Sequence, residues 1–428
     1  MREPFFYQEA LEYVRGFEKS KIKLGLERIE KALKAFNNPQ NSFKSIHIAG
    51  TNGKGSVGAF LDSLLAFENN FVGRFCSPHL ITPRERILVD GKPLTRQWFA
   101  ASVSILRDKI EEESLELSYF EFFTLLAFYV FSFLKVDYGI VETGLGGRLD
   151  STNTLKHPEL TIITSLSKDH TQFLGETISS IAGEKAGIIK PGVPVLTSAK
   201  GEALMIIDRE CKKKSSPLYT LEEIGFEFDG KSVYLKRFNI SSRTVLNGLF
   251  QAENLALALA AFSLLTGKGG DLSNAISKTI WPARLEHFRL AEGKVLIVDG
   301  AHNIDAIGKV SESIKPLENS LLIFGCMKDK SVRDMFEIIK TKFRNIALTA
   351  GEYHRFMKEE DFREMGIKED FYSLEQLPDL IEKYEEIYVL GSLHLAGDFL
   401  KTLYEDGRYK DAISKKEPYS FIFDDYPY

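Results

Sequence analysis

The chain has 428 residues, more than the roughly 250 to 300 that one hydrophobic core usually supports, so two domains are expected. Hydrophobic residues make up 44% and charged residues 27% of it, which excludes a disordered chain and indicates a globular protein. The formal net charge of -5 gives no overall attraction to nucleic acid or to an anionic membrane, so we expect a small-molecule partner and neither of these two.

The N-terminal segment and the cysteines point to a reducing cytoplasm. The stretch MREPFFYQEALEYV carries charges within its apolar region and lacks a small-residue cleavage site, unlike a secretory signal. Cys76, Cys211 and Cys326 are far apart and form no C-x-x-C pair, which argues against a disulfide framework and a zinc site. The apolar run at residues 122–134 is shorter than the about 20 residues that span a bilayer, so we expect a buried helix there and a cytoplasmic location.

From Ser45 onward, short apolar runs alternate with amphipathic stretches. Strands that are apolar throughout and separated by helices predict a mostly parallel sheet covered on both faces. The expected strands are SIHIAG, FVGRFCS, YGIVETG, LTIITSL and VPVLTSA, and the expected helices include residues 54–68, 178–187 and 202–213. The first part of the chain is therefore expected to be an α/β domain.

The pattern changes further along the chain. Residues 218–246 hold short alternating runs around a turn at Asp229 and Gly230, which predicts a small antiparallel insertion, and a stretch with helical periodicity follows. Further strand candidates with helices between them predict a smaller α/β domain, Rossmann-like in pattern: VLIVDGA, SLLIFGC, NIALTA and EIYVLGS. We therefore expect domains at residues 1–288 and 289–428. The aromatic and acidic tail EPYSFIFDDYPY receives no role from its sequence.

The stretch GTNGKGS, residues 50–56, directly follows the first expected strand. A phosphate site needs backbone N–H groups, a helix N-terminus and a nearby cation, and glycines let the backbone approach closely. The glycine-rich turn, Lys54, Ser56 and the following helix supply these features in the right order. The spacing differs from G-x-x-x-x-G-K-[ST], so the residues leave two interpretations: a phosphate-binding loop, or a tight turn with an exposed lysine.

This variant spacing resembles the loop of the Mur ligase superfamily, and the form HIAGTNGKGS is similar to that of the folylpolyglutamate synthase and dihydrofolate synthase family. Further stretches resemble motifs of that family in the family's order: GLERIEKALKAFNNPQNSF, SPHL, ERI, VETGLGGRLDSTN, DHTQFLG, EKAGIIKPGVPV, QAEN, WPARLE and DGAHN. They span most of residues 25–303, and past Asn303 the resemblance rests on MKDKS and GSLHLAG. It implies a P-loop-type ATPase domain followed by a domain that contributes to nucleotide and glutamate binding.

The resemblance implies that ATP binds to the loop residues Thr51, Asn52, Gly53, Lys54, Gly55 and Ser56, and that two magnesium ions accompany it. Glu142 ends an expected buried strand, and carboxylates are seldom buried without a partner, so a cation is expected beside it. The resemblance implies that this cation is magnesium, bound also by the Ser56 hydroxyl as in P-loop enzymes. An ordinary ion pair would satisfy Glu142 as well.

His170 and Lys185 are the other candidate metal ligands and, with Lys54, the candidate catalytic residues. A lone histidine is usually structural; the family motif implies that His170 approaches the second magnesium ion, although magnesium prefers oxygen ligands. From its sequence context, Lys185 is a helix lysine in a salt bridge. The resemblance implies instead that its amine carries CO2 as a carbamate that holds magnesium. Burial would favour this by lowering the pKa of Lys185, because the neutral amine attacks CO2.

The resemblance implies four nucleotide-binding residues outside the loop: Asn254, Arg284, Asp299 and His302. Asn254 could instead cap the first turn of its helix. Arg284 could reach the phosphates with its guanidinium; the family pattern usually has glycine before it, whereas this chain has Ala283. Asp299 and His302 follow an expected strand and could instead form a strand-end turn and a helix cap.

For the second substrate, the resemblance places Ser77, His79 and Arg86 beside a folate. Asp150 matches the position that meets a pterin in family members that use dihydropteroate, and it could equally form a turn. The expected partners are thus folate or dihydropteroate and L-glutamate, bound by a monomer.

The implied activity is an ATP-dependent ligase that adds L-glutamate to the terminal carboxylate of folates through an acyl phosphate. It could also glutamylate dihydropteroate. The alternatives are a cell-wall amino-acid ligase, a P-loop kinase and a nucleotide-gated binding protein. The stretches NNPQ and SPHL argue against the first, and neither of the others explains a second α/β domain that opens with DGAHN.

Overall fold

The computed structural model describes residues 3–19 and 25–423, and the chain forms two compact units. The first unit comprises Met1–Pro78, Arg84–Val245 and Ala252–Thr279, and the second comprises His79–Pro83, Leu246–Gln251 and Ile280–Tyr428. Residues 280–288, which we expected in the first domain, thus group with the second unit. In the part of the chain that the structure covers, no helix has both the length and the apolar character needed to cross a membrane.

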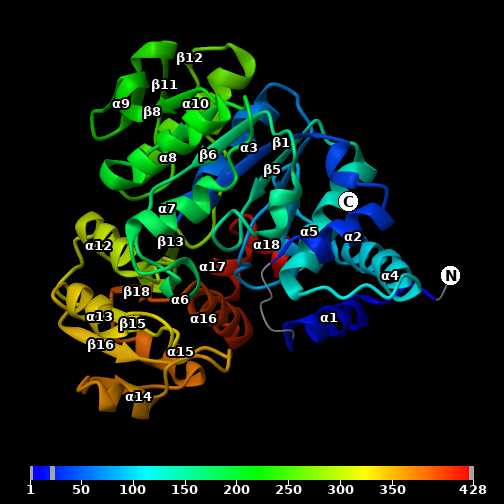
Figure 1. Ribbon diagram of the computed structural model, residues 1–428. Coiled ribbons are helices and arrows are strands. Elements are labelled where there is room, and N and C mark those ends of the chain that lie inside the picture. The colour runs from blue at the N-terminus through cyan, green and yellow to red at the C-terminus, as the bar shows by residue number, and fades with distance from the viewer. Residues whose placement is uncertain (1–2, 20–24, 424–428) are drawn as a thin grey trace. The chain divides into compact units, whose positions relative to one another are not determined.

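The first unit is built on an eight-stranded sheet, whose central strands lie beside α3 in Figure 1. In spatial order the strands are β4 (Lys92–Pro93), β3 (Ile87–Val89), β2 (Val72–Phe75), β5 (Tyr138–Glu142), β1 (Lys44–Ala49), β6 (Leu160–Ile163), β7 (Val195–Thr197) and β8 (Leu218–Thr220). The strands from β2 to β8 pair in parallel, and β3 and β4 add an antiparallel edge. The mostly parallel sheet predicted from the apolar runs is confirmed.

Helices cover both faces of this sheet, as strands buried on both sides require. On one face, α3 (Lys54–Phe67) lies so close that a Cβ on Gly58 would contact Ile48 and Ile140. On the other, Val141 joins an aromatic core with α5 (Tyr119–Leu134). The remaining helices are α1 (Tyr7–Gly16), α2 (Glu27–Ala35), α4 (Arg96–Glu112), α6 (Thr171–Leu174), α7 (Ile178–Ala186), α8 (Gly201–Lys214), α9 (Leu221–Ile224), α10 (Gln251–Thr266) and α11 (Ser273–Ile276). The apolar run at residues 122–134 is therefore a buried helix, as predicted.

The small insertion is a second sheet with the order β12 (Gly270–Asp271), β11 (Ile240–Arg243), β10 (Ser232–Leu235) and β9 (Phe226–Phe228). The antiparallel pairing of β9, β10 and β11 confirms the predicted insertion. Asp229 shapes the predicted turn by accepting hydrogen bonds from the backbone N–H groups of Lys231 (2.8 Å) and Ser232 (2.7 Å). The insertion starts later than predicted, because β8 extends the large sheet by pairing with β7.

The second unit holds a six-stranded sheet with the order β13 (Glu286–Arg289), β14 (Val295–Val298), β18 (Glu386–Leu390), β15 (Ser320–Phe324), β16 (Asn345–Leu348) and β17 (Asp370–Phe371). All pairs are parallel except β13 with β14. The four predicted strands are confirmed, whereas β13 and β17 are too short or too polar to have been recognised.

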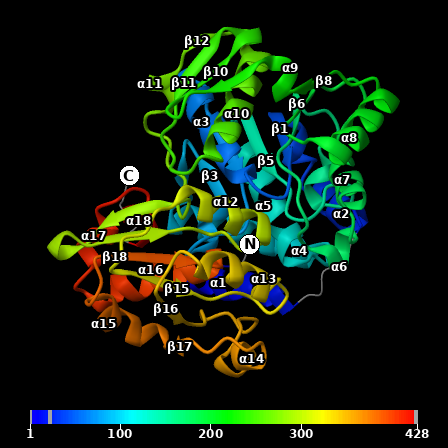
Figure 2. The same ribbon diagram turned by 90° about the vertical axis from the view of Figure 1, so that its left-hand side faces the viewer.

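Two hydrophobic cores cover the two faces of this sheet. One contains α12 (Ile304–Ser313) and α13 (Val332–Lys340), drawn in yellow in Figure 2, and the other contains α16 (Leu393–Asp406), drawn in red. The remaining helices are α14 (Glu359–Glu364), α15 (Leu377–Ile381), α17 (Lys410–Ser414) and α18 (Tyr419–Phe423). This arrangement is the smaller α/β domain that the sequence predicted.

Candidate active site

The glycine-rich loop joins the end of β1 to the start of α3, as the sequence predicted. Gly53 directly precedes α3 with a φ of +92°, a conformation that side chains with a Cβ rarely adopt. A Cβ on Gly53 would lie 2.3 Å from the Asn254 Oδ1 atom, and one on Gly50 would lie 1.8 Å from the Thr164 Oγ1 atom. Both glycines are therefore required by the close approach of neighbouring groups, and Asn254 lies directly against the loop.

Hydrogen bonds fix this loop to the segment after β6. The Thr51 N–H donates to the Ser165 carbonyl (2.9 Å), and the Thr51 hydroxyl donates to the Ser167 carbonyl (3.0 Å). The Ser167 N–H donates back to the Thr51 hydroxyl (3.1 Å), and the Thr164 hydroxyl donates to the Asn52 carbonyl (2.7 Å). Thr51 and Asn52 thus hold the shape of the loop, which leads into the first turn of α3 with Gly55 and the buried Ser56.

Two lysine amines converge on one carbonyl group of the loop. Lys185 Nζ donates to the Gly50 carbonyl at 2.8 Å, and Lys54 Nζ donates to the same oxygen at 3.1 Å. Lys54 Nζ also lies 3.6 Å from Glu142 Oε1. Glu142 ends β5 and is only 6% exposed, so this ion pair satisfies the expectation of a cation beside a buried carboxylate. The structure thus brings together Lys54, Glu142 and Lys185, which lie far apart in the sequence.

The surroundings of Lys185 favour its neutral form. Burial and, to a lesser extent, the charge of Lys54 lower the pKa of Lys185 to about 7, against the opposing effects of Asp169, Asp150 and Glu142. Close to neutral pH, a large fraction of this amine is therefore unprotonated and nucleophilic. The predicted carbamate requires this property, and the carbamate itself remains a prediction.

His170 lies at a more open position. It precedes α6 in a left-handed conformation, with a φ of +50°, and its side chain is 40% exposed. The neighbouring Asp169 carboxylate accepts the backbone N–H of His170 (2.8 Å). Among the residues that the structure covers, no three His, Cys, Asp or Glu side chains form a metal-binding group. The predicted ligand set contains only two such side chains, Glu142 and His170, so it depends on the Ser56 hydroxyl and on carbamate oxygens from Lys185.

Asp150 shapes the loop that follows β5. Its Oδ2 atom accepts the backbone N–H groups of Gly144 (2.9 Å) and Leu145 (2.8 Å), and its Oδ1 atom accepts the N–H (3.0 Å) and hydroxyl (2.5 Å) of Thr152. The Thr152 hydroxyl donates to Asp150, so it accepts from the buried His47 Nε2 at 2.8 Å. Asp150 therefore has the turn-forming role that the sequence left open. Sequence reasoning missed His47 because nothing in the strand pattern distinguishes it from its apolar neighbours.

The other predicted folate residues fall in both units. Ser77 and Arg86 belong to the first unit, whereas His79 belongs to the second, where its ring lies 6.2 Å from the ring of His394. Arg86 is buried, and its guanidinium lies over the rings of Tyr119 (5.1 Å) and Phe123 (5.3 Å). These rings fix the position of the Arg86 guanidinium.

Three predicted nucleotide-binding residues lie in the second unit near the ends of β13 and β14: Arg284, Asp299 and His302. The Asp299 carboxylate accepts the Leu285 N–H at 2.7 Å, and its other oxygen accepts the Ala301 N–H at 2.7 Å. His302 Nδ1 lies 2.8 Å from the Gly300 carbonyl, which can only accept, so Nδ1 carries the proton and Nε2 is the acceptor nitrogen of the neutral ring. Asp299 thus shapes the turn beside Arg284, and the Gly300 carbonyl orients the His302 ring.

Comparison with known proteins agrees with this architecture. Residues 283–391 match the family model described as Mur ligase, glutamate ligase domain. The dihydrofolate synthase/folylpolyglutamate synthase of Bacillus subtilis is 33% identical over 93% of this chain and 99% of its own length. The dihydrofolate synthetase of Saccharomyces cerevisiae is 30% identical over 89% of this chain and 98% of its own.

A solved structure of Mycobacterium tuberculosis folylpolyglutamate synthase, complexed with ADP and AMPPCP, superposes with a TM-score of 0.81 at 26% identity, covering 93% of this chain and 99% of that chain. Fold and sequence therefore agree along nearly the whole length. The chain belongs to the folylpolyglutamate synthase and dihydrofolate synthase family of amide-forming ligases.

Proposed function

We propose that this protein joins L-glutamate to the terminal carboxylate of folates at the expense of ATP. One observation carries the proposal: the amines of Lys54 and Lys185 meet at the Gly50 carbonyl, beside the Glu142 carboxylate, where β1 and β5 end. Ligands of open α/β sheets bind at such strand ends. The family relationship supports the reaction class.

The loop would hold the triphosphate of ATP. Backbone N–H groups at the start of α3 point toward an anion there, and Lys54 Nζ would exchange the Gly50 carbonyl and Glu142 for phosphate oxygens. Asn254, packed against Gly53, and Arg284, Asp299 and His302 of the second unit would bind the rest of the nucleotide. A divalent cation fits the oxygen atoms of Glu142 and Ser56 and would neutralise phosphate charge.

Lys185 would carry a carbamate. Its neutral amine attacks the carbon of CO2, an N–C bond forms, and one proton is released. The neutral amine then becomes an anion close to Lys54, whose positive charge it would partly offset. The carbamate oxygens, Glu142, Ser56 and His170 would together hold the metal ions.

In the reaction, a folate carboxylate oxygen attacks the γ-phosphate and ADP leaves, which gives an acyl phosphate. The amine of L-glutamate then attacks the acyl carbon, phosphate leaves, and the amine loses a proton. Ser77, His79, Arg86 and Asp150 would bind the folate. Dihydropteroate is a second candidate acceptor, because curated relatives carry the name dihydrofolate synthase. We further propose that the enzyme acts as a cytoplasmic monomer.

The test is phosphate release from ATP, measured with folate, dihydropteroate and glutamate added singly and together. We expect phosphate only when ATP, glutamate and one of the two acceptors are all present. ADP without free phosphate would indicate a kinase, and nucleotide binding without turnover would indicate a binding protein. Either result would overturn the proposal.

A further inference from the structure

We infer that Tyr419, in the C-terminal tail, is a positioning residue for Arg284: its hydroxyl fixes the carboxylate of Glu286, which in turn holds the strained turn that carries Arg284. All of these residues lie in the second unit. The inference rests on the proposed role of Arg284 in binding ATP. It also assigns a role to the tail, for which the sequence offered none.

The turn around Arg284 has an unfavourable backbone conformation. Ala283 (φ +52°) and Leu285 (φ +43°), on either side of Arg284, both occupy the left-handed region without being glycine. Such residues persist only where surrounding contacts force the conformation. The direction of the Arg284 side chain therefore depends on whatever holds its two neighbours.

Two carboxylates hold this turn, one on each side. Asp299 Oδ2 accepts the Leu285 N–H at 2.7 Å, and Glu286 Oε2 accepts the Ala283 N–H at 2.9 Å. The Ala283 carbonyl accepts the Gly300 N–H at 2.9 Å and the Arg284 Nη1 at 2.8 Å, so the turn also orients the guanidinium directly.

The tail fixes the Glu286 carboxylate. The Tyr419 hydroxyl donates to Glu286 Oε2 at 2.6 Å, and Lys416 Nζ lies 3.1 Å from Oε1. Glu286 is 8% exposed and Tyr419 is fully buried, so water does not readily replace this hydroxyl. The same oxygen that holds Ala283 is therefore oriented by a residue more than a hundred positions away in the chain.

The part of the tail that the structure describes, up to Phe423, packs against the sheet and α16. The Tyr419 ring meets the Phe288 ring of β13 edge to face at 5.3 Å, and Lys416 Nζ lies 4.4 Å from the centre of the same ring. At the end of α18, Phe423 stacks on Tyr404 of α16 at 4.0 Å. Because Tyr419 has no exposed surface, its effect on a nucleotide must pass through the turn.

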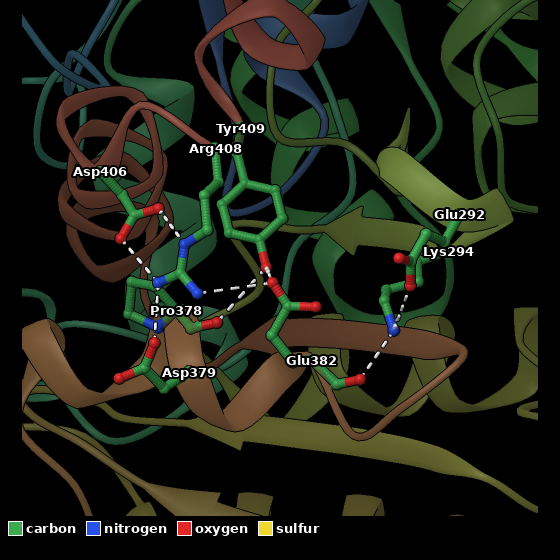
Figure 3. Close-up of polar contacts among 8 residues, drawn as sticks. All are labelled: Glu292, Lys294, Pro378, Asp379, Glu382, Asp406, Arg408 and Tyr409. Atoms are coloured by element: carbon green, nitrogen blue, oxygen red, sulfur yellow. Dashed lines mark hydrogen bonds and ion pairs between the residues drawn. The ribbon is translucent and has the colours of Figure 1, made fainter.

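The experiment compares Tyr419→Phe with Tyr409→Phe in the full chain. Tyr409 is also buried, and its hydroxyl donates at 2.6 Å to the carboxylate of Glu382, the residue that directly follows α15 (Figure 3). We expect Tyr419→Phe to raise KM for ATP about fivefold, with kcat at saturating ATP and KM for glutamate unchanged. Tyr409→Phe should leave KM for ATP, kcat and KM for glutamate unchanged, even if it lowers the melting temperature as much as Tyr419→Phe does.

A rescue variant separates positioning from general stability. Adding Ala283→Gly to Tyr419→Phe should return KM for ATP to the parent value, because glycine adopts a positive φ without needing the carboxylate. Failure of this rescue, or an equal rise in KM for Tyr409→Phe, would overturn the inference.

Arg284→Ala distinguishes this inference from the proposed function. If Arg284→Ala leaves KM for ATP unchanged in an active enzyme, the proposed role of Arg284 is wrong and the inference falls with it. If Arg284→Ala raises KM and Tyr419→Phe does not, only the inference is wrong.

Discussion

The two units use buried charge in different ways. In the first unit, two lysine amines share the Gly50 carbonyl, and the nearby Glu142 carboxylate pairs with one of them at 3.6 Å. In the second, the carboxylates of Glu286 and Asp299 accept backbone N–H groups at 2.7 to 2.9 Å. The first arrangement presents positive charge that an anion can neutralise. In the second, the negative charges accept backbone hydrogen bonds and thereby fix the shape of a turn.

Burial acts on both sites but leads to different consequences. It lowers the pKa of Lys185 to about 7, and it raises the pKa of Asp299 above the usual range, against the charge of Arg284 and the hydrogen bonds from Leu285 and Ala301. Lys185 becomes chemically reactive, since a neutral amine is a nucleophile. Both oxygens of Asp299 already accept hydrogen bonds from backbone N–H groups. We therefore expect substitutions in the first unit to slow the chemical step more than substitutions in the second unit do.

The largest effect is expected for Lys54→Ala. In the proposed function Lys54 stabilises the transferring phosphoryl group, so its removal should lower turnover by about 100- to 1000-fold. Phosphate release with ATP, folate and glutamate measures this loss. The control is Lys156→Ala, because Lys156 is 57% exposed and pairs only at the surface with Glu30, and this variant should keep full activity. If Lys54→Ala lost little turnover, the expectation that substitutions in the first unit affect the chemical step more strongly would be wrong.

The second largest effect is expected for Lys185→Ala, which removes the proposed carbamate. Activity should fall by about 100-fold, and added formate or raised bicarbonate should restore part of it by supplying a small carboxylate in the vacated space. The control is Lys190→Ala. Burial lowers the pKa of Lys190 to about 8, but its amine donates to Asn153 and not to the loop. Full activity of Lys185→Ala, or the same rescue in Lys190→Ala, would remove the carbamate from the mechanism.

The sequence predicted the loop better than the turn, for physical reasons. Residues 50–56 are contiguous, and the strand, the glycines and the helix that shape them are local in the chain, so the pattern is visible in the sequence. Lys185 could be linked to this loop only through family resemblance, because its contact with Gly50 is set by the packing of α7. Glu286 and Tyr419 were missed entirely, since a hydrogen bond between distant residues leaves no periodic signal.

A smaller effect is expected for Asp150→Asn, which keeps the size of the side chain but removes its charge. The variant should unfold with a free energy lower by about 2 kcal/mol, because backbone N–H groups lose a charged acceptor. If Asp150 also meets a pterin, KM for dihydropteroate should rise more than KM for a folylpolyglutamate. Denaturant unfolding and both kinetic assays measure this.

The control for Asp150→Asn is Asp137→Asn, because Asp137 accepts the Phe71 N–H at 2.8 Å in an exposed position. It should change neither KM. Equal rises of the two KM values in Asp150→Asn would leave Asp150 with its turn-forming role alone.

The pH dependence that Lys185 brings is a further difference between the two units. Its pKa is about 7 in the folded chain against 10.5 for an ordinary lysine, so the folded state binds fewer protons than the unfolded state between these pH values. The contribution of Lys185 to the free energy of unfolding therefore rises with pH from about 7 to about 10.5 and is constant below about 7. Denaturant unfolding at several pH values measures this: the free energy of unfolding should rise more steeply with pH in the parent chain than in Lys185→Met, and equal slopes would contradict the prediction.

Carbamate formation should follow the same titration. At a fixed concentration of dissolved CO2, the neutral fraction of the Lys185 amine increases from about one tenth at pH 6 to about nine tenths at pH 8. Less CO2 should then be needed for half-maximal activity at pH 8 than at pH 6, by well over about tenfold, because the neutral fraction rises and carbamate formation also releases a proton. The measurement is turnover as a function of the CO2 concentration at the two pH values, with known amounts of CO2 added to degassed buffer. Because the charge of Lys54 helps to lower the pKa of Lys185, Lys54→Met should move the pH at which the free energy of unfolding starts to rise to a higher value, whereas an unchanged pH would show that burial alone sets the pKa of Lys185.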